Sequence, residues 1–149
     1  MSYDLMVFDP KAPPPDRKGF LDWYRRQTKW DKGQRYDDPA VSTPELRAWF
    51  FDMIAHYPMV SGPYASEEDS SKVTDYSVGR SVIYAGFAWS EMAPAFEKVF
   101  SLAQKHGLGF FDVSTGNGGV WLPDAEGIFR CVHGQGAKGT RKWWQVWKR

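Results

Sequence analysis

The segment Ser2–Asp9 constrains the fold most, because apolar side chains occupy both of its faces. In an extended strand successive side chains point to opposite sides, so Leu5 and Val7 share one face while Met6 and Phe8 share the other. A strand that is apolar on both faces needs a cover on both sides. We therefore expect this segment to lie inside a sheet that has packed layers on each face.

Three helices are predicted from capping signals and apolar spacing. Asp16 is positioned to cap the first helix. Residues 42–45 (Ser-Thr-Pro-Glu) have the capping-box pattern with proline in the first turn, so a second helix begins there and ends before Pro58. Ser90 is the expected N-cap of a third helix, which Gly107 ends. The second helix has an apolar stripe spaced by three and four residues, formed by Leu46, Trp49, Phe50, Met53, Ile54 and Tyr57.

The remaining apolar runs predict short strands that turn residues separate. The expected order is β-α-α-β-β-α-β-β, which predicts an α+β domain of an elaborated β-α-β-β-α-β kind. Its sheet should be mixed but mainly antiparallel, with about three helices packed on it. The length of 149 residues fits one domain, residues 1–149. The expected strands after the first are residues 73–78, 81–89, 108–113 and 120–122. Residues 127–133 are compatible with a further strand, and residues 141–149 with a strand or a short helix.

Charge divides the chain into an acidic body and a basic C-terminal segment. All 18 acidic residues lie in residues 1–129 with 13 basic ones, a net charge of −5, whereas residues 130–149 carry six basic residues and no acid. Such a division indicates a tail that docks on its own body, or two surfaces for different partners. The single cysteine, Cys131, the lack of a basic leader and the lack of a long apolar run favour the cytoplasm and no membrane partner.

The candidate metal-binding, nucleophilic and phosphate-binding motifs do not have the residue spacing that their chemistry requires. We therefore predict that the protein is not an enzyme and has no cofactor. Cys131 and His133 alternate along one expected strand and would share a face, but no second pair completes a metal site. Their spacing is not that of a known catalytic nucleophile and base, and a structural role for Cys131 and His133 is the better interpretation. The glycine-rich residues 134–140 lack the order of a phosphate-binding loop, because Lys138 precedes the last glycine.

The tryptophan-rich C-terminal segment has two interpretations. Basic and aromatic side chains together bind nucleic acid through phosphate neutralisation and base stacking. The same residues also suit an edge strand whose rings cover the sheet while the charges prevent edge pairing, and we favour this structural interpretation. The nucleic-acid alternative depends on Arg141, Lys142, Trp143, Trp144, Trp147 and Lys148.

Several stretches of the body give the chain a resemblance to a group of small bacterial proteins. These stretches are Tyr3–Phe8, Tyr36–Pro39, Asp75–Gly79, Ile83–Ser90 and Gly109–Val113. Proteins of this kind resemble the cytoplasmic immunity partners of contact-dependent or type VI-delivered bacterial toxins. The resemblance implies a binding protein without chemistry, whose partner is a cognate protein toxin. A homodimer is also compatible with the sequence.

An inhibitor of this kind needs a preformed surface of acids and aromatic rings to cover a basic cleft. Aromatic residues make up 17% of the chain, which indicates either an aromatic core or such a binding surface. Predicted loops are the natural source of the surface. The expected partner-binding residues are Tyr36, Asp37, Asp38, Tyr64, Glu67, Glu68 and Asp69.

Overall fold

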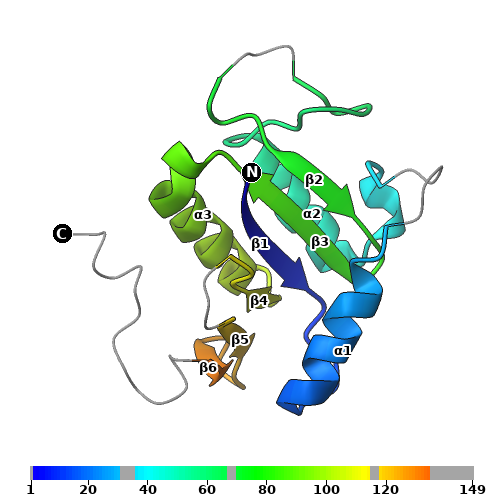
Figure 1. The fold of residues 1–149 in the computed structure, drawn as a ribbon, viewed down its shortest axis with the longest axis vertical. Helices are drawn as coiled ribbons and strands as arrows, with labels where there is room; N and C mark the ends of the chain where they lie inside the picture. Colours follow the sequence, from blue (N-terminus) through cyan, green and yellow to red (C-terminus); the bar gives the residue numbers. More distant parts are fainter. Residues whose placement is uncertain (1, 31–35, 67–69, 115–117, 135–149) are drawn as a thin grey trace.

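The computed structural model describes residues 2–30, 36–66, 70–114 and 118–134. These residues form a sheet with helices packed on it, which confirms the α+β class (Figure 1). The expected structure of residues 141–149 lies outside the described residues. In chain order the elements are β1 (Tyr3–Phe8), α1 (Arg17–Gln27), η1 (Pro39–Val41), α2 (Pro44–Ile54), β2 (Asp75–Val78), β3 (Val82–Phe87), η2 (Trp89–Glu91), α3 (Met92–Lys105), β4 (Gly109–Phe111), β5 (Val120–Pro123) and β6 (Phe129–His133).

The six strands form one sheet in the order β2-β3-β1-β4-β5-β6. Every neighbouring pair is antiparallel, so β1 runs against both β3 and β4. Parallel pairing occurs in the described part of the chain at two isolated bridges, from Met59 to Ala65 and from Met59 to Thr74. The strand that the sequence predicts to be covered on both sides thus lies inside the sheet.

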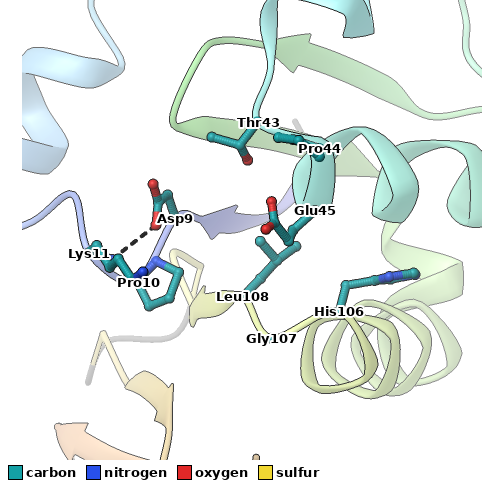
Figure 2. Close-up of a pocket in the computed structure, with 9 residues that line it drawn as sticks. All are labelled: Asp9, Pro10, Lys11, Thr43, Pro44, Glu45, His106, Gly107 and Leu108. Carbon is teal, nitrogen blue, oxygen red and sulfur yellow. Dashed lines mark hydrogen bonds between the residues drawn. The ribbon is translucent and has the colours of Figure 1, made fainter.

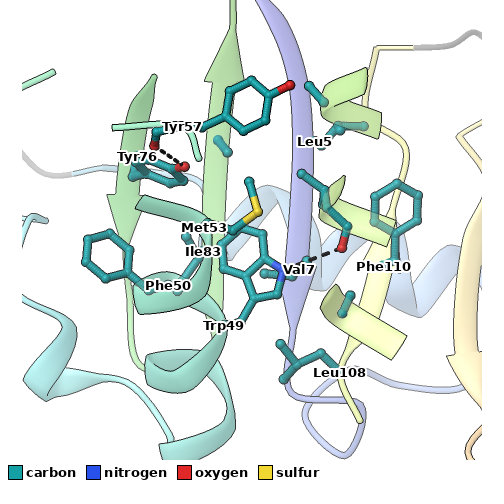
Figure 3. Packing of buried hydrophobic residues seen from close by; sticks show 14 of the residues in the cluster. Leu5, Val7, Trp49, Phe50, Met53, Tyr57, Tyr76, Ile83, Leu108 and Phe110 are labelled. Carbon is teal, nitrogen blue, oxygen red and sulfur yellow. Dashed lines mark hydrogen bonds between the residues drawn. The ribbon is translucent and has the colours of Figure 1, made fainter. Parts of the chain in front are cut away.

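Two apolar clusters lie on opposite faces of the sheet and meet at β1. Leu5 and Val7 belong to the cluster that α2 and α3 cover, whereas Met6 and Phe8 belong to the cluster that α1 covers. All four side chains are fully buried. Figure 3 shows the first cluster, in which α2 places Trp49, Phe50 and Met53 against Val7 and Ile83 of the sheet. The alternating apolar pattern of β1 therefore fixes the layer order of the molecule.

Capping side chains start the first two helices. The carboxylate of Asp16 accepts a hydrogen bond from the backbone N–H of Gly19 at 2.8 Å and caps α1, as predicted. In α2 the N-cap is Thr43, whose hydroxyl accepts from the N–H of Leu46. The capping box expected from Ser42 is wrong, because the Ser42 hydroxyl donates instead to the carbonyl of Gly79 at 2.6 Å. This bond ties the start of α2 to the β2–β3 turn.

The start of α3 differs from the prediction, whereas its end agrees. Ser90 is not the N-cap, because it lies within η2 and Glu91 precedes the helix without a side-chain capping bond. At the other end Gly107 has a φ of +69°, and the N–H of Leu108 donates to the carbonyl of Ala103 at 2.9 Å. This is the glycine-terminated geometry that the sequence predicts.

A β-bulge in β6 separates two residues that were expected to share a face. His133 pairs with Val120, but Cys131 pairs with Trp121, so the register shifts between them. Cys131 consequently packs against the α2–α3 side of the sheet, whereas the ring of His133 lies 6.1 Å from that of Phe20 on the α1 side. The expected common face of Cys131 and His133 is wrong, because the extra residue of a bulge reverses the alternation.

Candidate functional site

Tyr36, the first of the expected partner-binding residues, lies beside β2 and is half-buried. The N–H of Val78 donates to the Tyr36 carbonyl at 2.7 Å. The Tyr36 ring packs edge-on against that of Trp30, with 4.7 Å between centroids. Tyr36 therefore anchors its loop, and only part of its ring is open to a partner.

Asp37 and Asp38 follow this anchor and face different neighbours. The Asp38 carboxylate accepts from the N–H of Ala40 at 2.9 Å and caps η1, while the residue as a whole stays exposed. Asp37 lies against Gly62, where an added Cβ would sit 2.6 Å from the Asp37 carboxylate. The structure therefore brings the loop of residues 36–38 next to the loop that carries Tyr64.

Tyr64 is exposed and forms an aromatic pair with Phe51 of α2. The two rings are 42% and 41% exposed, and their centroids lie 5.3 Å apart in an edge-on arrangement. Both also contact the buried ring of Phe50, at centroid distances of 5.5 Å for Phe51 and 6.0 Å for Tyr64. Two large rings thus stand on the surface in a fixed mutual orientation.

The outer face of α2 extends this pair into a longer apolar surface. Ala48, Phe51 and Ala55 are all exposed and recur at spacings of three and four residues, so they lie on one helix face. We call the set of Ala48, Phe51, Ala55 and Tyr64 the α2 ridge. It is separate from the buried stripe that Leu46, Trp49, Phe50 and Met53 turn toward the sheet.

The helix that carries the ridge is fastened to α3 by charged groups. The imidazole Nε2 of His106 lies 2.7 Å from the Asp52 carboxylate, and the Lys105 ammonium lies 3.2 Å from it. The hydrogen bond with His106, and then the contact with Lys105, hold the pKa of Asp52 below its usual range. Asp52 is thereby kept ionised, and α2 is cross-linked to the helix beside it.

The other expected site residues lie outside the described part of the chain. Glu67, Glu68 and Asp69 belong to this group, as do the residues of the nucleic-acid alternative. The latter are Arg141, Lys142, Trp143, Trp144, Trp147 and Lys148.

A pocket opens at the start of α2, one turn before Ala48, the first residue of the ridge (Figure 2). It has a volume of about 440 Å³. Three segments form it: the chain after β1, the first turn of α2 and the end of α3. Its lining residues are Asp9, Pro10, Lys11, Thr43, Pro44, Glu45, His106, Gly107 and Leu108.

A polar network on the α1 side of the sheet was not foreseen from the sequence. The Tyr84 hydroxyl donates to the Asp4 carboxylate at 2.6 Å, and the Ser2 hydroxyl donates to its other oxygen at 2.5 Å. Burial, followed by the hydrogen bond to Asp4, raises the pKa of Tyr84, so its phenol stays protonated and remains a donor. The sequence did contain a signal for this network, because Asp4 is a charged residue in an otherwise apolar strand. The Asp4 carboxylate thus accepts hydrogen bonds from two side chains of the fold.

Across residues 2–30, 36–66, 70–114 and 118–134, no group of three or more His, Cys, Asp or Glu side chains is arranged to hold a metal ion. In that part of the chain, no helix combines the length and the apolar character needed to cross a membrane.

The α2 ridge and the pocket beside it are therefore the candidate functional site. Sequence reasoning identified Tyr64 but missed Phe51, which lies off the predicted stripe of its helix. Comparison with protein-family models, with curated proteins and with solved structures finds no match to this chain.

Proposed function

We propose that this protein is a non-catalytic binding protein, an immunity protein that neutralises a cognate bacterial toxin by covering its active site. The observation that carries the proposal is the exposed pair of Phe51 and Tyr64. Rigid aromatic rings that project from a surface are enriched at the centres of protein interfaces, where they supply much of the binding energy. A helix face gives them a fixed position, which lowers the entropic cost of binding.

Acidic groups beside the rings support a basic partner. Asp38 is exposed, and Asp37 lies next to the loop that carries Tyr64. The body of residues 1–129 has a net charge of −5. An acidic surface raises the rate of association with a basic cleft and disfavours acidic partners. The active sites of toxins that cleave nucleic acid are basic clefts of this kind, because they have to bind phosphates.

The proposal assigns no catalysis to this chain. Three carboxylates in the described part of the chain that lie near hydroxyl or cationic groups bind side chains of the fold itself. Asp4 accepts from Tyr84 and Ser2, and Asp52 pairs with His106. Glu91 accepts from Tyr57 at 3.2 Å and from Ser71 at 3.2 Å. These networks position helices and strands.

The test is to search the genes beside this one for a toxin domain and to co-express any such domain with this protein. Cells that produce the toxin domain should survive when they also produce this protein, and Phe51→Asp should abolish the protection. Ile128→Asp is the matched control, because Ile128 is also an exposed apolar residue, 49% accessible, but lies outside the ridge. Truncation of a central interface ring usually costs about 2 kcal/mol or more, which weakens binding at least about 30-fold.

Two results would overturn the proposal. If the protein never protects cells from a toxin encoded beside it, the immunity function is wrong. If Phe51→Asp protects as well as Ile128→Asp does, the toxin does not bind on the α2 ridge. Circular dichroism of both variants checks that each is folded.

A further inference from the structure

The pocket at the start of α2 is lined by both acidic and apolar side chains. Asp9, which follows β1, and Glu45, in the first turn of α2, both line it. Figure 2 shows the Glu45 carboxylate directed toward the side of Asp9, and the Asp9 carboxylate accepts a hydrogen bond from the backbone N–H of Lys11 at 3.0 Å. Pro10 and Pro44 supply its apolar surface, and the side chain of Leu108, which is only 1% exposed, lies at its base. The site therefore combines negative charge at two sides with a surface that an alkyl chain can cover.

The charges around the pocket favour a cation. Among its nine lining residues, Lys11 opposes the two carboxylates, which leaves the balance negative. The end of α3 at residues 106–108 contributes the negative pole of that helix. The start of α2 contributes a positive pole of similar size, which offsets that of α3, so the side-chain charges leave the pocket negative.

We infer that this pocket takes an arginine side chain of the partner protein. Arginine has an apolar stem that packs along Pro10 and Pro44, and a planar cationic head that pairs with the carboxylates of the pocket. The inference rests on the proposed function, because it assigns the pocket and the α2 ridge to one interface. Glu45 lies three residues before Ala48, so a partner that covers the ridge also reaches the pocket mouth.

The pocket can be tested without the toxin. The probe is N-acetyl-arginine amide, titrated into the isotope-labelled full-length protein while backbone amide signals are followed by NMR. We expect saturable shifts at Lys11, Gly107 and Leu108, with a dissociation constant of the order of millimolar. N-acetyl-norleucine amide, which has an apolar side chain and no charge, should shift these signals much less.

Substitutions at the walls separate charge from shape. The double variant Asp9→Asn/Glu45→Gln keeps the size of both side chains and should weaken arginine binding at least tenfold. Glu126→Gln is the control, because Glu126 is an exposed acid on the turn between β5 and β6. Equal binding of the arginine and norleucine probes would overturn the inference, as would unchanged arginine binding in the double variant or the absence of saturable shifts.

The outcome can be told apart from a failure of the proposed function. If the probe binds and Phe51→Asp still protects cells, the pocket recognises arginine but the ridge interface is wrong. If the ridge is required and the probe does not bind, the partner uses the ridge without the pocket, and this inference fails alone. Loss of protection in the double variant, with the probe result positive, places both features in one interface.

Discussion

Phe50 and Phe51 occupy adjacent positions on α2 in opposite environments, so the same substitution should have very different effects. Phe50 is fully buried, and Phe51 is 41% exposed. Phe50→Ala removes a core ring and should lower the free energy of unfolding by about 3–5 kcal/mol. Phe51→Ala loses the covered part of one ring and its edge-on contacts, about 1–2 kcal/mol. The better helix propensity of alanine offsets roughly 0.5 kcal/mol of this, which leaves a net loss of about 1 kcal/mol.

Urea unfolding followed by circular dichroism measures both losses, with unchanged m-values as the condition for comparing them. Affinity for the toxin domain gives the second readout. Phe51→Ala should weaken binding strongly despite its small effect on stability, whereas the folded fraction of Phe50→Ala should still bind. If Phe51→Ala is as destabilising as Phe50→Ala, Phe51 is a core residue and the reasoning about the ridge is refuted. If Phe51→Ala binds like the wild type, the ridge does not contact the toxin.

Three further measurements test other parts of the structure. Burial, and then the nearby charge of Arg17, hold the pKa of His133 below its usual range. As the pH falls below about 6.5 the unfolded chain is protonated first, so stability should decrease until the folded pKa is passed, and His133→Gln should flatten that part of the urea-stability profile. Gly109→Ala places a methyl group against the buried ring of Phe8 and should cost about 1–3 kcal/mol in the same assay; a neutral effect would contradict the packing. Deletion of residues 138–149 should leave toxin protection intact, because the ridge lies within residues 48–64, whereas loss of a salt-dependent RNA affinity with this deletion would support the nucleic-acid alternative.

Local patterns predicted the architecture where one segment alone determines the outcome. The two apolar faces of Ser2–Asp9 required a covered strand, and β1 lies between two apolar clusters. Asp16 and Gly107 act as predicted because a cap depends on a few neighbouring backbone groups. These features need no information about the rest of the chain.

The predictions were wrong where contact with a distant segment of the chain determines the local conformation. The Ser42 hydroxyl bonds to the carbonyl of Gly79, which is remote in sequence, and the helix therefore begins after Thr43. The bulge that separates Cys131 from His133 arises from the pairing of β6 with β5. In both cases the partner that decides the conformation is brought close only by the tertiary fold.

Only part of the candidate site could be predicted, because some of its features are local and others depend on tertiary contacts. Tyr64 was identified because a loop tyrosine is expected to be exposed, but its contact with Phe51 joins two elements whose packing is tertiary. The approach of Asp37 to Gly62 is also tertiary. Phe51 did leave a signal in the sequence, because it is a large ring outside a stripe that was already complete.

The two apolar sides of α2 have different physical roles. A helix of eleven residues needs one apolar stripe to pack on a sheet, and Trp49, Phe50 and Met53 provide it with complete burial. A second apolar face is not needed to attach the helix to the sheet, and an exposed aromatic pair increases the risk of aggregation. The Asp52–His106 contact further holds the helix against α3, so the rings are presented on a rigid element. A rigid, preorganised apolar face beside an acidic pocket is the arrangement that binding to a basic protein surface would require.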